Sequence, residues 1–212
     1  MAFSPITPFD FREENYCLLD LTAKNPELSS IDFGNIDAFN NYVSDTLEKA
    51  KVKVALGGWL EKRIVYNQKS HFQGEDQRCY HLGVDIWAEA YTPIFAPEDC
   101  SIHSYKNNST DGDYGPTIVL KSNAQEIFYL FGHLSLTSLE RLKNRKRIRK
   151  GEHFSEMGPY PENGNWPPHL HFQVMTTMEG RVGDFPGVCS EKELSHYRNI
   201  CLNPNPFLNL KG

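Results

Sequence analysis

From about residue 80 onwards, the sequence is a series of short apolar or alternating segments separated by turn-rich ones. The short segments read "HLGVDIW", "PIFAP", "SIHSY", "TIVLK", "IFYLFGHL" and "HLHFQVM", and clusters such as "NNSTDGDYGP" and "PYPENGNWPP" lie between them. Short runs bounded by Gly, Pro and Asn are typical of strands, and many of them in succession are typical of an all-β fold. We therefore predict a mainly β protein, built as an antiparallel sandwich or barrel.

The region before residue 70 has a different pattern. The stretch "NIDAFNNYVSDTLEKAK" places four apolar residues at helical spacing: Phe39, Val43, Leu47 and Ala50. This spacing predicts a helix over about residues 36–52, and the two glycines of "ALGGWLEKR" are expected to end it. The N-terminal segment is thus expected to add a small helical part to a β protein.

The charge of the chain argues against nucleic acid and membranes as partners. Lys and Arg total 22 against 27 Asp and Glu, so the formal net charge is -5, which gives no general attraction to polyanions. The run "RLKNRKRIRKG" is the exception, with seven basic residues between Arg141 and Lys150. A nucleic-acid patch usually interleaves aromatic residues, and this run has none, so we interpret it as a solvated loop or strand end.

The ends of the chain and its cysteines predict a cytoplasmic protein. The start "MAFSPITPFDFREENYCLLDLTAK" lacks the basic and apolar regions of a signal peptide, and no run of about 18 apolar residues predicts a membrane span. An odd number of cysteines without a signal favours free thiols in a reducing compartment. The five cysteines are Cys17, Cys79, Cys100, Cys189 and Cys201. Nothing in the sequence indicates the oligomeric state.

Two of the short segments place polar side chains together on one face of a strand. If "HLGVDIW" is a strand, Leu82, Val84 and Ile86 form a core stripe. His81 and Asp85 then share the opposite face, with only a glycine between them, and that glycine is expected to leave space for an ion or substrate.

The segment "HLHFQV" follows the same logic. Leu170, Phe172 and Val174 are expected to face the core, and His169 and His171 to share the other face. Their repeat along a strand is roughly 6.5–7 Å, whereas a Zn–N bond is about 2.0–2.1 Å. On a regular strand, one histidine would therefore ligate an ion while the other stands beside it.

These residues together predict a catalytic zinc site. Such sites typically use three protein ligands and keep one position for water. The candidate ligands are His81, Asp85 and one of His169 and His171. The other histidine of that pair and His133, in "YLFGHLS", would be the helpers that handle protons or stabilise charge.

At these residues the sequence resembles the lysostaphin-type (LytM-domain) zinc endopeptidases. Their pattern is H-x-x-x-D, then Y/F-x-H-L, then H-L-H-F, and here it reads "HLGVD", "LFGHLS" and "HLHF" in the same order. The resemblance implies that the zinc ligands are His81, Asp85 and His171. It also implies that His133 and His169 are catalytic histidines that do not bind the metal.

The resemblance covers about residues 78–175 and implies a fold, the compact antiparallel duplicated hybrid motif. We expect a peptidase domain over residues 71–180, with an N-terminal segment (1–70) and a C-terminal tail (181–212) packed on its core. The stretches "NNSTDGDYGPTI", "ENGNWPPHLHF" and "GDFPGVC" resemble more closely the peptidase-type domain that is fused to class-III aminotransferases.

The implied function is that of a zinc-dependent metallopeptidase, which hydrolyses a peptide or related amide bond with a metal-activated water. Peptidoglycan-type peptides are the family's substrate, His169 would be the general base, and His133 would stabilise the oxyanion. The alternative is a non-catalytic metal-binding or regulatory module of the same fold. The loop "ENGNWPP" is bulkier and stiffer than the small Ser/Thr/Gly-rich loop of secreted members, so specificity is expected to depend on Trp166.

Other polar residues near these motifs leave alternatives open. Cys79 is a fourth ligand, a redox-sensitive thiol or an inert buried thiol, and Arg78 or Tyr80 either stabilises an oxyanion or is structural. A second zinc site in the tail would use Cys189, His196 and Cys201, but their spacing matches no strong zinc pattern, so free thiols are favoured.

Overall fold

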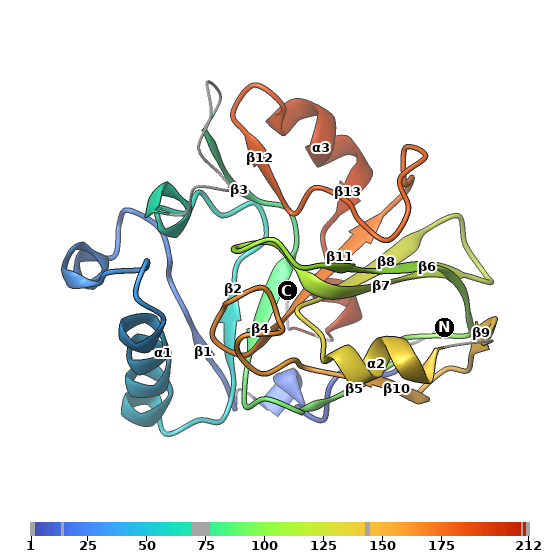
Figure 1. Ribbon diagram of the computed structural model, residues 1–212, viewed down its shortest axis with the longest axis horizontal. Coiled ribbons are helices and arrows are strands. Elements are labelled where there is room, and N and C mark those ends of the chain that lie inside the picture. The colour runs from blue at the N-terminus through green and yellow to red at the C-terminus, as the bar shows by residue number, and fades with distance from the viewer. Residues whose placement is uncertain (1–2, 14, 69–76, 143–144, 209, 211–212) are drawn as a thin grey trace.

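The computed structural model describes residues 3–13, 15–68, 77–142, 145–208 and 210. A sheet of nine strands runs through the centre of the molecule, in the order β1-β2-β4-β11-β8-β7-β6-β9, and β13 also pairs with β11 (Figure 1). These strands are β1 (Cys17–Leu18), β2 (Ala55–Gly57), β4 (Val84–Trp87), β6 (Cys100–Asn108), β7 (Gly115–Ser122), β8 (Phe128–Gly132), β9 (Arg147–Ile148), β11 (His169–Met175) and β13 (Cys201–Leu202).

The main sheet is antiparallel except at β1 and β2, which pair in parallel. Strands β1 and β9 are its two ends, so it does not close on itself. Closure would need these end strands to hydrogen-bond to each other, and each is only two residues long. The prediction of a mainly β fold is confirmed, and of the two architectures considered, the closed barrel is wrong.

Two small sheets flank the main one. Strand β5 (Pro93–Phe95) pairs with β10 (His153–Glu156), and β3 (Arg78–His81) pairs with β12 (Val188–Ser190). The prediction of one continuous strand over "HLGVDIW" is therefore wrong, because β3 ends at His81 and β4 begins at Val84 in a different sheet.

Leu82 shows why this strand breaks. Its backbone N–H donates to the carbonyl of Gly187 (2.8 Å) rather than to a strand of the main sheet. Its side chain packs in a separate apolar cluster with Phe185, whereas Val84 and Ile86 belong to the principal core. The predicted stripe of three residues is thus divided between two cores.

Strand β11 agrees with its predicted pattern. Leu170, Phe172 and Val174 all lie in the principal core, and the Phe172 ring contacts the ring of Phe131 on β8 (5.2 Å between centroids). Every residue of β11 is buried, so the polar face that carries His169 is covered as well as the core face.

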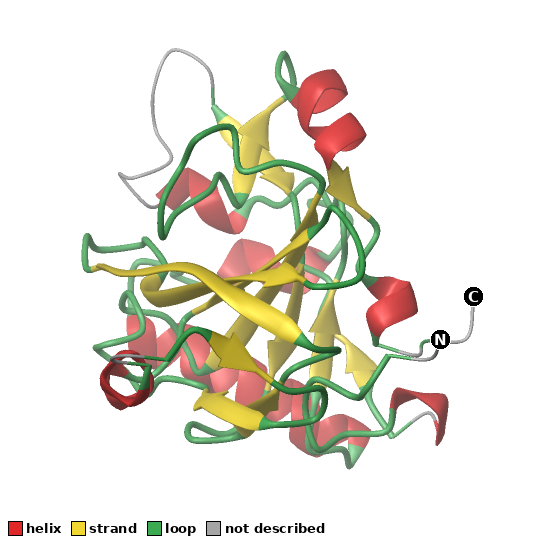
Figure 2. Ribbon diagram, turned by 90° about the vertical axis from the view of Figure 1, so that its right-hand side faces the viewer, coloured by secondary structure: helices red, strands yellow, loops and turns green. Residues whose placement is uncertain are grey.

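The helices lie outside the strands, some of them behind the strands in the view of Figure 2. They are α1 (Ile36–Ala50), α2 (Leu136–Arg141) and α3 (Leu194–Ile200), and the short 3-10 turns η1 (Phe11–Glu13), η2 (Pro26–Ser30), η3 (Val65–Gln68) and η5 (Asn205–Phe207). No helix in the described ranges combines the length and the apolar composition that crossing a membrane requires.

Helix α1 begins where it was predicted and ends two residues earlier than expected. The Asn35 side chain caps its start by accepting the N–H groups of Asp37 and Ala38. Lys51 ends it in the left-handed conformation at φ 56°. The apolar face of α1 packs on the main sheet, where the Phe39 ring lies 5.5 Å from that of Trp87 on β4.

The N-terminal segment also extends the main sheet. Strand β2 pairs with β4 in a register that sets Gly57 opposite Asp85, and α1 lies beside β1 and β2 (Figure 1). Residues far upstream of the histidine motifs are therefore placed next to them in space.

Candidate metal centre

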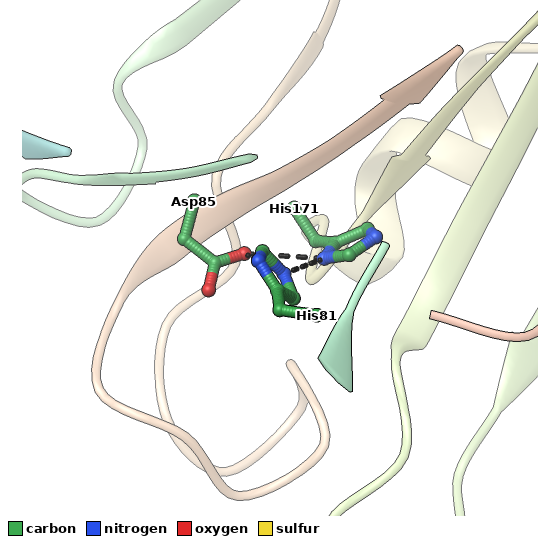
Figure 3. A group of neighbouring side chains, drawn as sticks. All are labelled: His81, Asp85 and His171. Carbon is green, nitrogen blue, oxygen red and sulfur yellow. Dashed lines mark hydrogen bonds and ion pairs between the residues drawn. The ribbon is translucent and has the colours of Figure 1, made fainter. Parts of the chain in front are cut away.

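Three of the predicted residues bring acceptor atoms together at the centre of the molecule. His81 Nε2 lies 2.9 Å from His171 Nδ1 and 3.2 Å from Asp85 Oδ1, and the last two atoms are 3.1 Å apart. The three side chains point toward one another from three strands (Figure 3). Among the residues that the structure describes, they form a group able to hold a metal ion.

Strand register explains two of the three positions. His171 on β11 is directly opposite Asp85 on β4, so their side chains are neighbours on one face of the sheet. His81 ends β3 and reaches the same point because the chain turns at Leu82 and Gly83 before entering β4.

Gly83 does have a steric role, but a different one from that expected. A Cβ at this position would lie 2.6 Å from the Phe172 carbonyl oxygen and 2.8 Å from His171 Nε2. The space that was predicted for an ion or substrate is therefore filled by the ring of His171.

Hydrogen bonds at the outer edges of His81 and His171 determine which of their ring nitrogens are protonated. His81 Nδ1 lies 2.9 Å from the carbonyl of Gly58, which can only accept, so Nδ1 carries the hydrogen. His171 Nε2 lies 3.0 Å from Gln173 Oε1, and the Gln173 amide is oriented by its own donation to the carbonyl of Pro186. In the neutral rings, His81 Nε2 and His171 Nδ1 therefore present lone pairs.

The three converging atoms thus fit a metal ion. Two imidazole lone pairs and one carboxylate oxygen meet with no hydrogen among them, in residues that are between 1% and 3% exposed. Such acceptors repel one another unless a cation lies between them. Four ligands around a tetrahedral zinc with bonds of about 2.0–2.1 Å are roughly 3.3 Å apart, close to the separations found.

His133 and His169 stand beside this triangle and do not belong to it. His169 Nε2 lies 4.0 Å from Asp85 Oδ1, and the rings of His133 and His169 are 4.1 Å apart. In each, Nδ1 donates to a backbone carbonyl, that of Pro167 for His169 (2.7 Å) and that of Asn163 for His133 (2.8 Å). The Nε2 atom of each neutral ring is therefore free to accept a proton.

His133 is not on a strand, contrary to the prediction. Strand β8 ends at Gly132, and His133 follows it with a left-handed φ of 60°, which is costly for a residue with a Cβ. Its backbone N–H donates to the carbonyl of Tyr114 (2.8 Å), which holds the strained conformation. The turn directs the ring toward His169 rather than along the sheet.

Burial keeps three of the site histidines, His81, His133 and His169, neutral near pH 7. Loss of solvent lowers the pKa of His81 and of His169 to about 4 in each case, and burial together with the neighbouring His169 lowers the pKa of His133 well below its ordinary value. Neutral imidazole is the form that ligates a metal or accepts a proton, so the site is prepared for both uses.

The metal-free protein should lose stability between pH 6.5 and about 4. The unfolded chain takes up protons on these histidines before the folded one does, so folding weakens as the pH falls. The expected loss is about 1.4 kcal/mol per pH unit for each buried histidine. The free energy of unfolding in urea, compared at pH 6.5 and 5.5, measures this loss. The control is His153→Gln, which replaces an exposed histidine. A free energy of unfolding that does not change with pH would contradict this prediction.

Arg63 is a component of the site that the sequence motifs did not indicate. Its Nη1 donates to Asp85 Oδ2 (2.5 Å) and its Nε to Glu61 Oε2 (2.7 Å), and the residue is 2% exposed. The guanidinium passes over Gly57, where a Cβ would collide with it. Burial would raise the pKa of Asp85, but the adjacent His81 and the guanidinium of Arg63 hold it well below its ordinary value.

Arg63→Met is therefore expected to weaken zinc binding by roughly 10–100-fold, because Asp85 loses the bond that orients its free oxygen. Arg63→Lys keeps the positive charge but lacks the planar guanidinium with its several donors. Its zinc affinity should therefore fall between those of the unmodified protein and of Arg63→Met. Competition with a chromophoric chelator measures the affinity. Lys62→Met is the matched control, since Lys62 makes an exposed pair with Glu191. Unchanged or tighter binding in folded Arg63→Met would show that Arg63 does not support the ligand.

The other candidate residues can now be placed relative to the group able to hold a metal and to its cleft. Cys79 is buried on β3 and is not part of the group able to hold a metal. Arg78 lines the cleft, whereas the Tyr80 ring is covered by Lys62. In the tail, the exposed His196 pairs with a glutamate. His71 lies outside the described residues.

Two tryptophans border the histidine pair. The Trp87 ring stacks on that of His169 with centroids 4.0 Å apart and an interplanar angle of 18°. Trp166 stands edge-on to His133 and His169, at 6.2 and 6.3 Å. The contact between Trp87 and His169 fixes the plane of the His169 ring.

The comparison with protein families gives a match in the central part of the chain. Residues 79–182 match the model of Peptidase family M23, a segment just under half of the chain's length. This segment contains the four site histidines and Asp85, whereas Arg63 lies upstream of it. Among the curated proteins, no sequence matches this chain.

Several solved structures are similar to this chain. The catalytic domain of the antimicrobial peptidase lysostaphin from Staphylococcus simulans is 23% identical, with a TM-score of 0.41 over 62% of this chain and 80% of that one. LytU is 22% identical, with a TM-score of 0.41 over 67% and 78%. A zinc-containing peptidase from Vibrio cholerae is 19% identical, with a TM-score of 0.34, and the match spans only 27% of its length.

Proposed function

We propose that the peptidase M23 segment at residues 79–182 makes this protein a zinc-dependent hydrolase of peptide or related amide bonds. The observation that carries the proposal is the meeting of three buried acceptors, His81 Nε2, Asp85 Oδ1 and His171 Nδ1, with no hydrogen among them. These three residues would hold the ion. Peptidoglycan-type peptides, the substrates that the sequence resemblance implies, are the proposed substrate class.

Zinc, when bound, would supply Lewis acidity that polarises a carbonyl and makes water nucleophilic near neutral pH. His169 is the proposed general base, because its Nε2 is unprotonated and lies 4.0 Å from Asp85 Oδ1. The bond from its Nδ1 to the Pro167 carbonyl strengthens when the ring becomes charged. The proton that His169 removes from water can then pass to the leaving amine.

The bond between His133 and Asn163 refines the role proposed for His133. Because its Nδ1 already donates to the Asn163 carbonyl, the neutral ring has no hydrogen left for an oxyanion. His133 can donate only after its Nε2 gains a proton, and the His169 ring next to it is 4.1 Å away. We therefore propose that the two histidines share the proton of the reacting water, so that the charged ring of the pair stabilises the oxyanion.

Purified protein should contain roughly stoichiometric zinc and should cleave members of a panel of peptides and muropeptides. A chelator should abolish the cleavage, and added zinc should restore it, because the metal supplies the Lewis acid. Mass spectrometry of the products identifies the bond that is cut. If no member is cleaved in a chelator-sensitive manner while zinc is retained, the alternative of a metal-binding or regulatory module is favoured instead.

Two finer points remain part of this proposal. The relationship to the peptidase-type domain fused to class-III aminotransferases is supported by the stretches "ENGNWPPHLHF" and "GDFPGVC". A reducing compartment such as the cytoplasm is supported by the five free thiols, four of which are buried.

A further inference from the structure

We infer that this site accepts a short peptide of about two residues, and not the interior of a polymer strand. The inference rests on the proposed function and names the size of substrate for the same site. Three features carry it: the burial of the reacting groups, the size of the cleft, and the segments that wall it.

The five site residues are almost completely buried. They are His81 (1% exposed), Asp85 (2%), His169 (3%), His171 (3%) and His133 (6%). An enzyme that cuts within a long chain needs a groove that continues on both sides of the reacting atoms, because the chain must enter and leave. All five of these residues line a single cleft, so the reacting groups lie at its floor.

The cleft above these residues is small. Its volume is about 210 Å³, below the range of about 300–1,000 Å³ that is typical of pockets for drug-sized ligands. A sphere of this volume is about 7 Å across, and an extended residue spans about 3.3–3.6 Å. The cleft therefore has room for about two residues.

One wall comes from the N-terminal segment, outside the part that matches the peptidase family. Phe39 on α1 and Tyr66 on η3 both line the cleft. Their rings stand edge-on to Trp166, at 6.3 and 6.5 Å between centroids. Trp166 in turn contacts the rings of His133 and His169, so this aromatic wall ends the cleft next to the proposed base.

A second wall is formed by Tyr114 and the tail. A Cβ on Gly187 would collide with the Tyr114 hydroxyl, and one on Gly132 would lie 2.6 Å from its ring. Tyr114 is thus held between two glycines, with its hydroxyl 3.5 Å from His171 Nε2. Trp166 Nε1 donates to the carbonyl of Asp113 (3.3 Å), which links the two walls.

Phosphinic pseudodipeptides, which mimic the transition state and bind zinc, test the inference. The zinc-loaded protein is titrated with the pseudodipeptide and with the same unit extended by several residues at each end. The short probe should bind about tenfold more tightly or better, and di- and tripeptides should be hydrolysed when long capped peptides and sacculi are not. Equal or tighter binding of the extended probe would overturn the size limit and leave the hydrolase proposal intact. Failure of both probes to bind would contradict the hydrolase proposal and the inference with it.

Trp166→Ala tests the aromatic wall itself. Removing the indole should raise the affinity for the extended probe. The affinity for the short probe should change less. Trp166→Phe is the matched control, since it keeps an aromatic ring at the wall, and thermal unfolding shows whether each variant is folded. Continued exclusion of the extended probe by folded Trp166→Ala would show that Trp166 does not limit substrate length. The probe comparison on the unmodified protein stands even if this variant does not fold.

Discussion

His81→Ala is expected to lose its zinc and, with it, all chelator-sensitive hydrolysis. The substitution removes one of three acceptors that lie 2.9–3.2 Å apart. Loss of a residue that only supports a ligand already costs roughly 10–100-fold in affinity, so loss of a ligand itself should cost more. Metal analysis of the dialysed protein and competition with a chelator measure this directly.

The control for this experiment is His153→Ala, which removes an exposed histidine on β10. It should keep the zinc content of the unmodified protein. Circular dichroism shows whether His81→Ala remains folded, because the Gly58 carbonyl also loses its donor in this variant. Full zinc retention in a folded His81→Ala protein would disprove the assignment of the site.

The part of the site that could be predicted from the sequence lies on regular strands. Alternation over "HLHFQV" placed His169 and His171 on one face, and β11 has that geometry. The same reasoning failed at "HLGVDIW", because it cannot show that a chain changes sheets between His81 and Val84. The two ends of that segment still meet at the site, since the turn at Gly83 brings His81 back beside Asp85.

The residues that support the site could not be found in this way. Arg63, Gly58 and Phe39 reach the site through tertiary packing of the N-terminal segment, and none of them lies in a motif. Asn163 contributes only a backbone carbonyl, which any residue type possesses. Periodicity reports which face of an element a residue occupies, and it does not report which distant segment lies against that face.

The outer hydrogen bonds explain how four histidines at one site can serve two tasks, metal ligation and proton acceptance. In His81, His133 and His169, Nδ1 donates to a backbone carbonyl, so Nε2 is the nitrogen that remains available. In His171 the pattern is reversed by Gln173, and Nδ1 is available instead. The outer hydrogen bond of each histidine thus decides which of its nitrogens can ligate or accept a proton, and the strand or turn that carries the histidine decides its position.

The second large effect is expected from the histidines beside the metal triangle. His169→Gln should keep its zinc, because His169 Nε2 is 4.0 Å from Asp85 Oδ1 and outside the group able to hold an ion. Its kcat should nevertheless fall by roughly 10²–10⁴-fold, the usual contribution of a general base. A glutamine side chain has similar length and can fill the space, but it cannot accept the proton at pH 7.

Parallel measurements on His133→Gln and on the double variant separate the two roles. If the two rings share one proton during the reaction, as their 4.1 Å separation suggests, the double variant should be little slower than the slower single variant, because residues that act as a unit are strongly non-additive. Independent roles would instead multiply the two losses. Zinc content measured on the same samples decides whether a loss of kcat belongs to proton transfer, since a variant that has lost its metal reports on ligation alone. Unchanged kcat in zinc-loaded His169→Gln would remove His169 from the reaction and leave His133 as the remaining candidate base.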